Sequence, residues 1–286
     1  MLSEKEIESY RRDGFIAVPD VLSSQEVEDL RRATDELIAS ASSITEHDET
    51  YDLEPDHTAE NPRVRRVKLP HLRHPAYAAT LRHAGILDIV EQLIGLGIRF
   101  QTTKLNMKSA DFGSPVEWHQ DWAFYPQTND DMLAVGVAID DMTQANGCLL
   151  VVPGSHRGPV RDHHEEGFFV GAVTDGAIEM KEAVPIEVPA GGISIHHVRT
   201  LHASAPNHSR HPRRLLLLEL AALDAWPLCG YGNWESFSKT VLRGTLNVQA
   251  RVEPVPARIP EPKPPRGGSI YEIQSQMSRP QMRYER

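Results

Sequence analysis

The residues best suited to chemistry lie in the stretch Trp118-His119-Gln120-Asp121-Trp122. Read as an extended strand, this stretch puts His119 and Asp121 on one face, because strand side chains alternate between two sides. An imidazole beside a carboxylate supplies two-thirds of the 2-His-1-carboxylate set that holds non-haem Fe(II) and leaves open positions for oxygen and a co-substrate. A His-x-Asp triplet is expected about once by chance in a histidine-rich chain, so the interpretation also needs a third ligand and an anchor.

The third ligand is expected on a later strand that folds back beside the first. His202 is the best candidate, because it follows a Gly-Gly turn and an apolar strand. His196 and His197 are rivals for this role, since they precede His202 by only a few residues. Adjacent histidines point to opposite faces of a strand, so at most one of these two can face the cavity.

A co-substrate anchor is predicted eleven positions after His202, at Arg213, which is followed by Arg214 and an apolar strand. An arginine at the mouth of a buried strand is costly unless an anion meets it. Its planar fork suits bidentate capture of a dicarboxylate. One of the two arginines is expected to be this anchor, and the other a solvated strand end.

Polar side chains also share one face of the strand expected just before the metal strand: Thr102, Lys104 and Asn106. Lys104 and Thr102 are candidates for binding the co-substrate. Lys104 could instead meet an anionic substrate; the alternative is a charge on a solvated strand face. The aromatic residues after the metal strand are candidates for a substrate-pocket wall, with ordinary core packing as the alternative. They are Trp122, Phe124 and Tyr125.

Composition excludes several classes of partner. The chain has 286 residues, 40% of them hydrophobic and 24% charged, as in ordinary soluble globular proteins. A formal net charge of −10 argues against nucleic acid, which requires a basic face, and gives no support for binding anionic membranes. No apolar run has transmembrane length, and the N-terminus lacks the apolar core of a signal peptide. A cytoplasmic protein is expected, with Cys148 and Cys229 as buried thiols in a reducing compartment.

The expected elements begin with helices and continue with strands. Capping boxes at Ser3 and Ser23 predict two helices separated by a short strand over residues 15–19, and residues 75–96 predict one broken helix or two short ones. Segments bounded by turn residues then predict strands over residues 98–106, 116–122, 132–139, 148–152, 186–188, 193–197 and 215–220. This order favours an α+β protein with a mainly β core, built as a barrel or jelly roll.

The remaining segments are expected at the surface. Residues 42–63 predict a surface loop and residues 158–184 a lid, and together they are expected to decide specificity. The proline-rich residues 254–265 are expected to be extended, and they could wrap a neighbouring subunit in a homodimer. No linker is evident, so we expect one domain over residues 1–286, with a helical part (1–97), a jelly-roll core (98–222) and a C-terminal extension (223–286).

Taken in order, these motifs resemble the phytanoyl-CoA dioxygenase-like family of Fe(II)/2-oxoglutarate oxygenases. The resemblance covers roughly residues 5 to 222 and, as a set, its motifs are quite specific. It rests on Asp13-Gly14-Phe15, Glu117 to Asp121, Asn146-Gly147-Cys148-Leu149, Val152 to His156, and His202-Ala203-Ser204 through Asn207 with Arg213 behind.

The resemblance implies a cupin-like double-stranded β-helix, with the N-terminal helices packed on one sheet, that binds iron through His119, Asp121 and His202. It also implies that Arg213 pairs with the distal carboxylate of 2-oxoglutarate and that Ser204 lies beside it. The implied activity uses O2, converts 2-oxoglutarate to succinate and hydroxylates a small organic substrate. A carboxylate at position 121 favours hydroxylation over halogenation.

The sequence departs from the family at Gly136, where many relatives place a tryptophan beside 2-oxoglutarate. A glycine there enlarges the cavity or admits another side chain. Two other classes of function use the same fold: a cupin-like binding or sensing protein without turnover, and a metal-dependent hydrolase or isomerase with another divalent ion. The pairing of Arg213 with Ser204 discriminates among these functions, because a hydrolase needs no dicarboxylate anchor.

Overall fold

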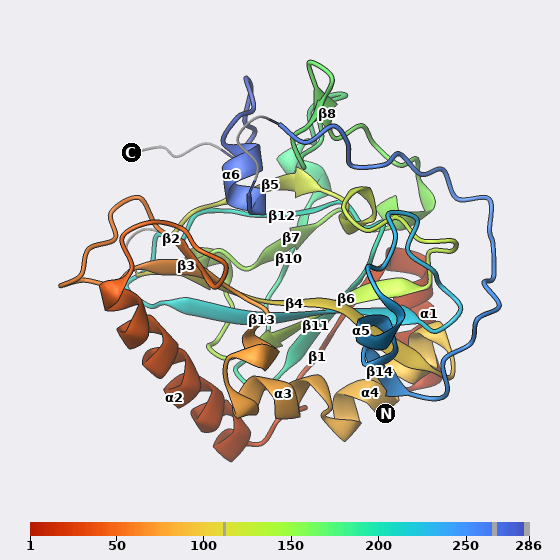
Figure 1. Cartoon of the computed structure of the whole chain (residues 1–286), viewed down its shortest axis with the longest axis horizontal. Helices are drawn as coiled ribbons and strands as arrows, with labels where there is room; N and C mark the ends of the chain where they lie inside the picture. Colours follow the sequence, from red (N-terminus) through yellow and green to blue (C-terminus); the bar gives the residue numbers. More distant parts are fainter. Residues whose placement is uncertain (111–112, 265–267, 283–286) are drawn as a thin grey trace.

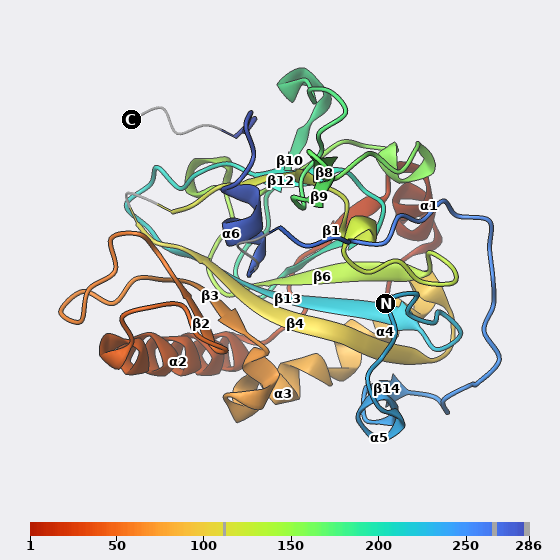
Figure 2. The ribbon, with the colours of Figure 1, turned by 45° about the horizontal axis from the view of Figure 1, so that its top comes forward.

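Two antiparallel sheets face each other and form the core of the molecule (Figures 1 and 2). The computed structural model describes residues 1–110, 113–264 and 268–282. The large sheet has the strand order β1-β11-β6-β13-β4-β3-β2, with β14 paired to β4, and the small sheet has the order β10-β7-β12-β5. The jelly-roll architecture predicted from the sequence is therefore confirmed.

The strands of the large sheet are β1 (Phe15–Val18), β2 (Tyr51–Leu53), β3 (Val64–Lys68), β4 (Ile98–Lys108), β6 (Met132–Ala138), β11 (Ile193–His197), β13 (Arg213–Ala222) and β14 (Val241–Arg243). The small sheet contains β5 (Val116–His119), β7 (Leu149–Val151), β10 (Val184–Ile186) and β12 (His202–Ser204). A separate hairpin joins β8 (His164–Glu165) to β9 (Phe168–Phe169). The helices are α1 (Glu4–Asp13), α2 (Ser24–Ser40), α3 (Pro75–Leu81), α4 (Ala84–Ile94), α5 (Trp234–Ser238) and α6 (Ile270–Gln274).

Helices α2, α3 and α4 cover the outer face of the large sheet (Figure 1). The hydroxyls of Ser3 and Ser23 accept hydrogen bonds from the backbone N–H groups of Glu6 and Glu26, so both predicted capping boxes are confirmed. Residues 75–96 form two short helices, α3 and α4. The main apolar core lies between these helices and the sheet, which fixes one face of the sheet toward the helices and the other toward the small sheet.

Strand alternation decides which side chains reach the space between the sheets. On β13, Leu216, Leu218 and Leu220 belong to the core beneath the helices. The intervening positions 213, 215, 217 and 219 line a cavity between the sheets. The same rule on β4 buries Leu105 with the helices and turns positions 104 and 106 into that cavity. A run of sequence that looks uniformly apolar therefore has two distinct faces.

Several boundaries differ from the predictions. The metal strand ends at His119, and Asp121 begins a 3₁₀ turn (Asp121–Ala123); Gln120 keeps an extended backbone (φ −119°, ψ 130°), so His119 and Asp121 still point to one side. The strand expected at 186–188 is Val184–Ile186, because its backbone pairs with β7 two residues earlier. Residues 42–63, expected to lack regular structure, contain β2, whose buried residues pair with β3.

The C-terminal extension contains elements that periodicity did not indicate: α5, β14 and α6. Residues 254–260 form no helix or strand and run along the surface (Figure 1), as expected; residue 265, the end of the proline-rich segment, lies outside the described residues. Cys148 is a buried free thiol as expected, but Cys229 is exposed. Within the described chain, no helix is both long enough and apolar enough to cross a bilayer.

Candidate metal centre and active site

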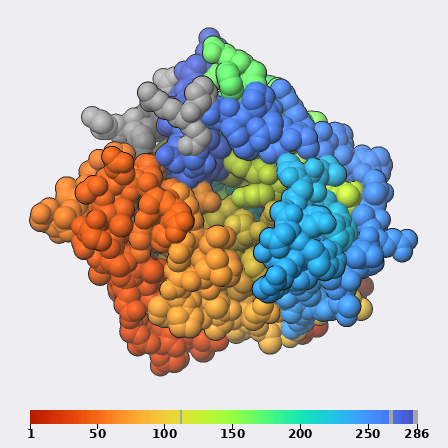
Figure 3. All heavy atoms as spheres, viewed as in Figure 1, coloured from red at the N-terminus to blue at the C-terminus, as the bar shows by residue number. Residues whose placement is uncertain are grey.

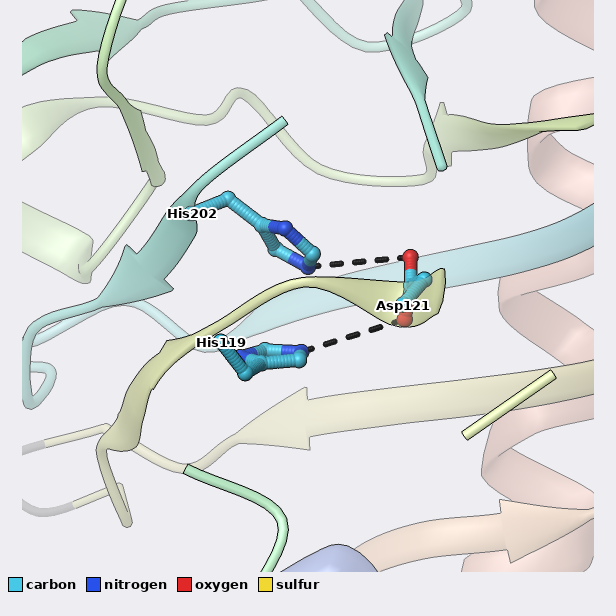
Figure 4. Close-up of side chains that lie close together, drawn as sticks. All are labelled: His119, Asp121 and His202. Carbon is cyan, nitrogen blue, oxygen red and sulfur yellow. Dashed lines mark ion pairs between the residues drawn. The ribbon is translucent and has the colours of Figure 1, made fainter. Parts of the chain in front are cut away.

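The structure brings together the three side chains predicted to bind metal. Strand β12 pairs with β5 so that His202 lies opposite His119. The Nε2 atoms of His119 and His202 lie 3.9 and 3.7 Å from the two carboxylate oxygens of Asp121. One ligand atom from each residue can be chosen so that all three lie within 4.8 Å of one another. Figure 4 shows both imidazoles pointing toward the carboxylate, an arrangement that fits a facial 2-His-1-carboxylate centre.

Hydrogen bonds fix which nitrogen of each histidine faces the centre. Nδ1 of His119 lies 2.7 Å from the carbonyl of Glu117, and Nδ1 of His202 lies 2.9 Å from the carbonyl of Thr200. Each Nδ1–H therefore donates to a carbonyl, which leaves the Nε2 lone pair facing Asp121. In both ligands, the backbone carbonyl two residues upstream fixes the orientation of the imidazole. The local chain conformation therefore orients both rings before a metal binds.

Burial keeps the two imidazoles unprotonated, which is the form that binds a metal. Burial lowers the pKa of His119 to about 4 and that of His202 well below its ordinary value. Burial alone would raise the pKa of Asp121, but the adjacent His202 and His196 outweigh it and hold that pKa well below its usual range. At neutral pH the centre therefore offers two neutral imidazoles and one carboxylate.

His196, a rival for the third ligand, faces the centre from the opposite sheet. Its Nε2 lies 3.2 Å from Oδ2 of Asp121, and its ring centroid lies 4.3 Å from that of His202. Neighbouring His197 turns away, with Nε2 4.0 Å from Asp130. The expectation that only one of this pair faces the cavity is confirmed. His196 is placed to orient the Asp121 carboxylate rather than to complete the set of ligands.

A deep cavity of about 60 Å³ adjoins the three ligands. Arg213 lines it, is 3% exposed, and has Nε and Nη1 buried without a hydrogen-bond partner. Ser204 and Asn106 line the same cavity, and Oδ1 of Asn106 is also unpartnered. A buried guanidinium with free N–H groups needs an anion, so Arg213, with the Ser204 hydroxyl in the same cavity, fits the carboxylate of a dicarboxylic co-substrate.

The neighbouring Arg214 points away from the cavity, but it is not the solvated strand end that was expected, because its side chain is only 13% exposed. Its guanidinium is paired with Asp140 at 2.8 Å and with Asp35 at 3.0 Å, on the side away from the cavity. Adjacent strand positions point to opposite faces, which explains why one arginine enters the cavity and the other meets surface carboxylates.

Lys104 lies where the deep cavity meets a larger outer one and lines both. Its ammonium donates to Glu219 at 3.0 Å and lies 5.0 Å from the centroid of the Tyr125 ring. Burial would lower the pKa of Lys104, but the Glu219 carboxylate outweighs it and raises that pKa, so Lys104 stays charged. Thr102 lies on the same strand opposite Glu219 and is not among the described residues that line either cavity.

The outer cavity has a volume of about 260 Å³ and shares Lys104, Asp121 and Ile270 with the deep one. Phe124 and Tyr125 line it as predicted, whereas Trp122 is fully buried and donates its indole N–H to the carbonyl of Pro256. Figure 3 shows this face hollowed between the orange segment of β2 and β3, the dark-blue segment of α6 and the light-blue segment after β13. The remaining lining residues are Arg66, Phe169, Lys263, Gly268, Ser269, Ile270 and Ile273.

Helix α6 covers this cavity from the C-terminal extension. The side chain of Gln274 accepts from the backbone N–H of Glu117 and donates to the carbonyl of Gly171. The buried carboxylate of Glu117 accepts from the backbone N–H groups of Gln281 and Met282. Hydrogen bonds therefore connect α6 and the residues after it to β5, the strand that carries His119. Of the two predicted specificity segments, 158–184 contributes Phe169, and no described residue of 42–63 lines either cavity.

Gly136, the departure from the family pattern, has no room for a side chain. A Cβ there would lie 2.6 Å from Oγ of Ser194 and 3.1 Å from a methyl group of Leu215. Leu215 and Leu217 occupy the adjoining wall of the deep cavity. The glycine therefore admits other side chains, one of the two consequences predicted for it.

Three charged residues that line the cavities were not predicted from the sequence: Arg66, Glu219 and Lys263. For Glu219 a signal was present, because it follows Arg213 by six positions and so shares the inward face of a strand. Arg66 and Lys263 carried no such signal, since β3 was not predicted as a strand and Lys263 lies in a segment without regular structure.

Comparisons with known proteins agree with this geometry. Residues 10–215 match the family described as Phytanoyl-CoA dioxygenase (PhyH). A "Probable alpha-ketoglutarate-dependent hypophosphite dioxygenase" of Stutzerimonas stutzeri is 37% identical over 96% of this chain and 97% of that protein. The L-proline trans-4-hydroxylase of Streptomyces griseoviridis is 29% identical over 73% of this chain and 82% of that protein.

Solved structures show the same fold. EvdO2 from Micromonospora carbonacea, complexed with 2-oxoglutarate, is 26% identical with a TM-score of 0.64, covering 82% of this chain and 98% of that one. EctD from S. alaskensis with bound Fe is 22% identical with a TM-score of 0.68, covering 91% and 89%. The chain belongs to the phytanoyl-CoA dioxygenase family and is an iron- and 2-oxoglutarate-dependent oxygenase.

Proposed function

We propose that this protein hydroxylates a small molecule at a centre held by His119, Asp121 and His202, with 2-oxoglutarate anchored by Arg213. One observation carries the proposal: a buried cluster of two neutral imidazoles and a carboxylate adjoins a buried arginine with free N–H groups. The cluster alone would fit several metal-dependent activities. The unpaired arginine distinguishes them, because only an enzyme that binds a second, anionic reactant needs it.

Each side chain has a role that its position supports. His119, Asp121 and His202 would hold the iron, which would supply oxygen activation when bound together with 2-oxoglutarate. Arg213 pairs with the distal carboxylate, Ser204 lies beside it, and Asn106 lines the same cavity. Lys104, held by Glu219, stands between the co-substrate and the outer cavity. Thr102 shares its strand and lies opposite Glu219 in the register of β4 with β13.

The outer cavity is proposed to hold the substrate. It adjoins Asp121, has aromatic and aliphatic residues in its wall, and is covered on one side by α6. Keeping water out of such a site protects reactive species and strengthens the remaining electrostatic interactions. The carboxylate at position 121 occupies a coordination position that halide would otherwise take, so hydroxylation is the proposed outcome.

Succinate formation tests the proposal. Purified protein with Fe(II) and 2-oxoglutarate under air is expected to release succinate, faster when a substrate is present. Hypophosphite and L-proline are the first substrates to try, because relatives are named for them. His119→Ala should lose iron binding and turnover, whereas His208→Ala, which changes an exposed histidine, should keep both. Absence of both 2-oxoglutarate binding and succinate release would favour a binding or sensing role.

A further inference from the structure

The outer cavity collects positive charge in a protein that is strongly acidic. Arg66, Lys104 and Lys263 line it, and Asp121, a proposed metal ligand, is the one carboxylate among its described lining residues. The chain as a whole carries a formal net charge of −10. A concentration of cations against that background is unexpected unless it serves a ligand of opposite charge.

Two of the three cations lack a charge partner. Lys104 is neutralised by Glu219 at 3.0 Å. Arg66 makes no ion pair with any described residue, and its Nε is buried without a hydrogen-bond partner. The ammonium of Lys263 lies 4.8 Å from the centroid of the Phe169 ring and likewise has no ion pair within the described part of the chain. The unpaired charges of the cavity are therefore those of Arg66 and Lys263.

These two cations come from different elements of the fold. Arg66 lies on β3, where its backbone pairs with that of Asn106, so it stands beside the strand that carries Lys104. Lys263 comes from the C-terminal segment that precedes α6 (Figure 1). A ligand between them would meet a planar guanidinium fork on one side and an ammonium on the other.

The rest of the wall limits what else the ligand can contain. Phe124, Tyr125, Phe169, Ile270 and Ile273 are aromatic or aliphatic. The volume of about 260 Å³ has room for a compact molecule but not for a coenzyme ester. Apolar walls with a few converging polar groups are the usual form of a small-molecule site.

We propose that the substrate is a compact anion whose carboxylate or phosphorus oxyanion is bound by Arg66, with Lys263 closing the site. This inference rests on the proposed function, because it identifies the outer cavity as the substrate site. The anionic group would be held at the rim, which leaves the remainder of the molecule between the apolar walls and Asp121. Arg66 and Lys263 are binding residues here and take no part in moving a proton.

Calorimetric titration under anaerobic conditions tests the proposal, with the iron-loaded protein saturated with 2-oxoglutarate so that Arg213 is occupied. The probes are methylphosphonate, hypophosphite, acetate and the neutral comparator acetamide. At least one anion is expected to bind at about one equivalent, and acetamide is not expected to bind. The three anions separate a preference for phosphorus oxyanions from one for carboxylates.

Variants then locate the bound anion. Arg66→Gln should weaken anion binding by about 10-fold or more, which is the scale for losing a charge-assisted hydrogen bond, and should leave 2-oxoglutarate affinity within about 2-fold. Lys263→Gln should weaken it less. Arg73→Gln, which removes an exposed arginine elsewhere, should change nothing. Acetamide binding as tight as that of the tightest-binding anion, or unchanged anion affinity in Arg66→Gln, would overturn the proposal.

The failure of this inference can be told apart from failure of the proposed function. In the Arg213→Gln protein without iron, the deep cavity cannot compete for the probe. Arg66-dependent binding of whichever of the three anions bound the loaded protein should persist. Anion binding by the Arg213→Gln protein, together with no binding of iron or 2-oxoglutarate by the unaltered protein, would support the anion site. The same result would contradict the proposed roles of the metal ligands and of Arg213. Normal binding of iron and 2-oxoglutarate without binding of any anion would support the proposed function and contradict the anion site.

Discussion

Arg213 and Arg214 show how one position along a strand separates two roles. Arg213 is buried with free N–H groups beside the metal cluster, and Arg214 is paired with Asp140 and Asp35. Burial lowers the pKa of Arg213, because the charged guanidinium is removed from water. An anion bound beside it would stabilise the charged form, so anion binding there is favourable. The sequence predicted Arg213 as the anchor, and the phase of the strand turns Arg213 rather than Arg214 into the cavity.

Arg213→Gln should raise the 2-oxoglutarate dissociation constant by about 100-fold, because a buried bidentate charge pair is lost. The measurement is equilibrium binding of 2-oxoglutarate to the iron-loaded protein. Arg214→Gln is the matched control: it should bind 2-oxoglutarate normally and lose about 1 kcal/mol of unfolding free energy with its partly buried ion pairs. If the two variants exchanged these behaviours, the assignment of the anchor would be wrong.

His196→Leu should weaken Fe(II) binding by about 10- to 100-fold, because the carboxylate of Asp121 loses the neighbouring donor that orients it. Competition with a chromogenic chelator gives the affinity. His196→Gln keeps a donor at similar reach and should recover part of the loss, and His197→Gln, whose imidazole faces away, should leave iron binding unchanged. Equal affinities in all three variants would rule out this orienting role.

At the scale of elements, β13 and β4 form the floor of the site because their polar residues repeat with period two. Arg213, Leu215, Leu217 and Glu219 alternate with leucines that pack under the helices. Glu219 is 1% exposed, and its Oε1 lies 3.0 Å from Lys104. A buried pair of this kind is tolerated when it holds a functional group in place, which here is Lys104 between the two cavities.

Gly136→Ala tests how tightly β6 fits against its neighbours. The added methyl group would meet the hydroxyl of Ser194 and a methyl of Leu215. The variant should lose about 1 to 3 kcal/mol of unfolding free energy, the usual cost of overpacking, measured by urea denaturation. Combining it with Ser194→Ala should recover part of the loss, because the closest obstructing atom is removed. An unchanged stability would mean that the adjoining wall yields easily.

At the scale of the whole molecule, buried histidines couple folding to pH. Nε2 of His163 accepts the backbone N–H of Gln120, between the two ligands of the metal strand, and Nδ1 donates to the carbonyl of Arg161. Burial lowers the pKa of His163 from 6.5 to about 4. The folded protein therefore favours neutral His163, so its contribution to stability is full above pH 6.5 and is lost as the pH falls toward 4.

Metal-free protein should lose about 2 kcal/mol of unfolding free energy between pH 7 and pH 5 through His163 alone. His163→Gln keeps an acceptor for the N–H of Gln120 but cannot take up a proton, so its stability should fall by about that much less over the same interval. Urea denaturation of both proteins at the two pH values measures the difference. Parallel losses in the two proteins would show that His163 does not contribute to this pH dependence.

The sequence by itself determined the residue types, their order and the two periodicities. Local patterns indicated the His119 and Asp121 pair, the helices capped by Ser3 and Ser23, and most strands of the jelly roll, because side-chain alternation and helix capping depend on residues close in the chain. His202 was the best candidate for the third ligand, with His196 and His197 left open as rivals. The role of Arg213 toward 2-oxoglutarate was implied by the family resemblance and not by periodicity.

Only the tertiary structure decided which of the neighbouring candidates face one another. It turned His196 toward Asp121 and His197 away, paired Lys104 with Glu219, and brought Arg66 and Lys263 to one cavity from segments nearly 200 residues apart. These contacts depend on strand register across two sheets and on where the C-terminal segment settles. Neither is encoded by local periodicity, because a shift of one residue in register moves every side chain of a strand to the other face.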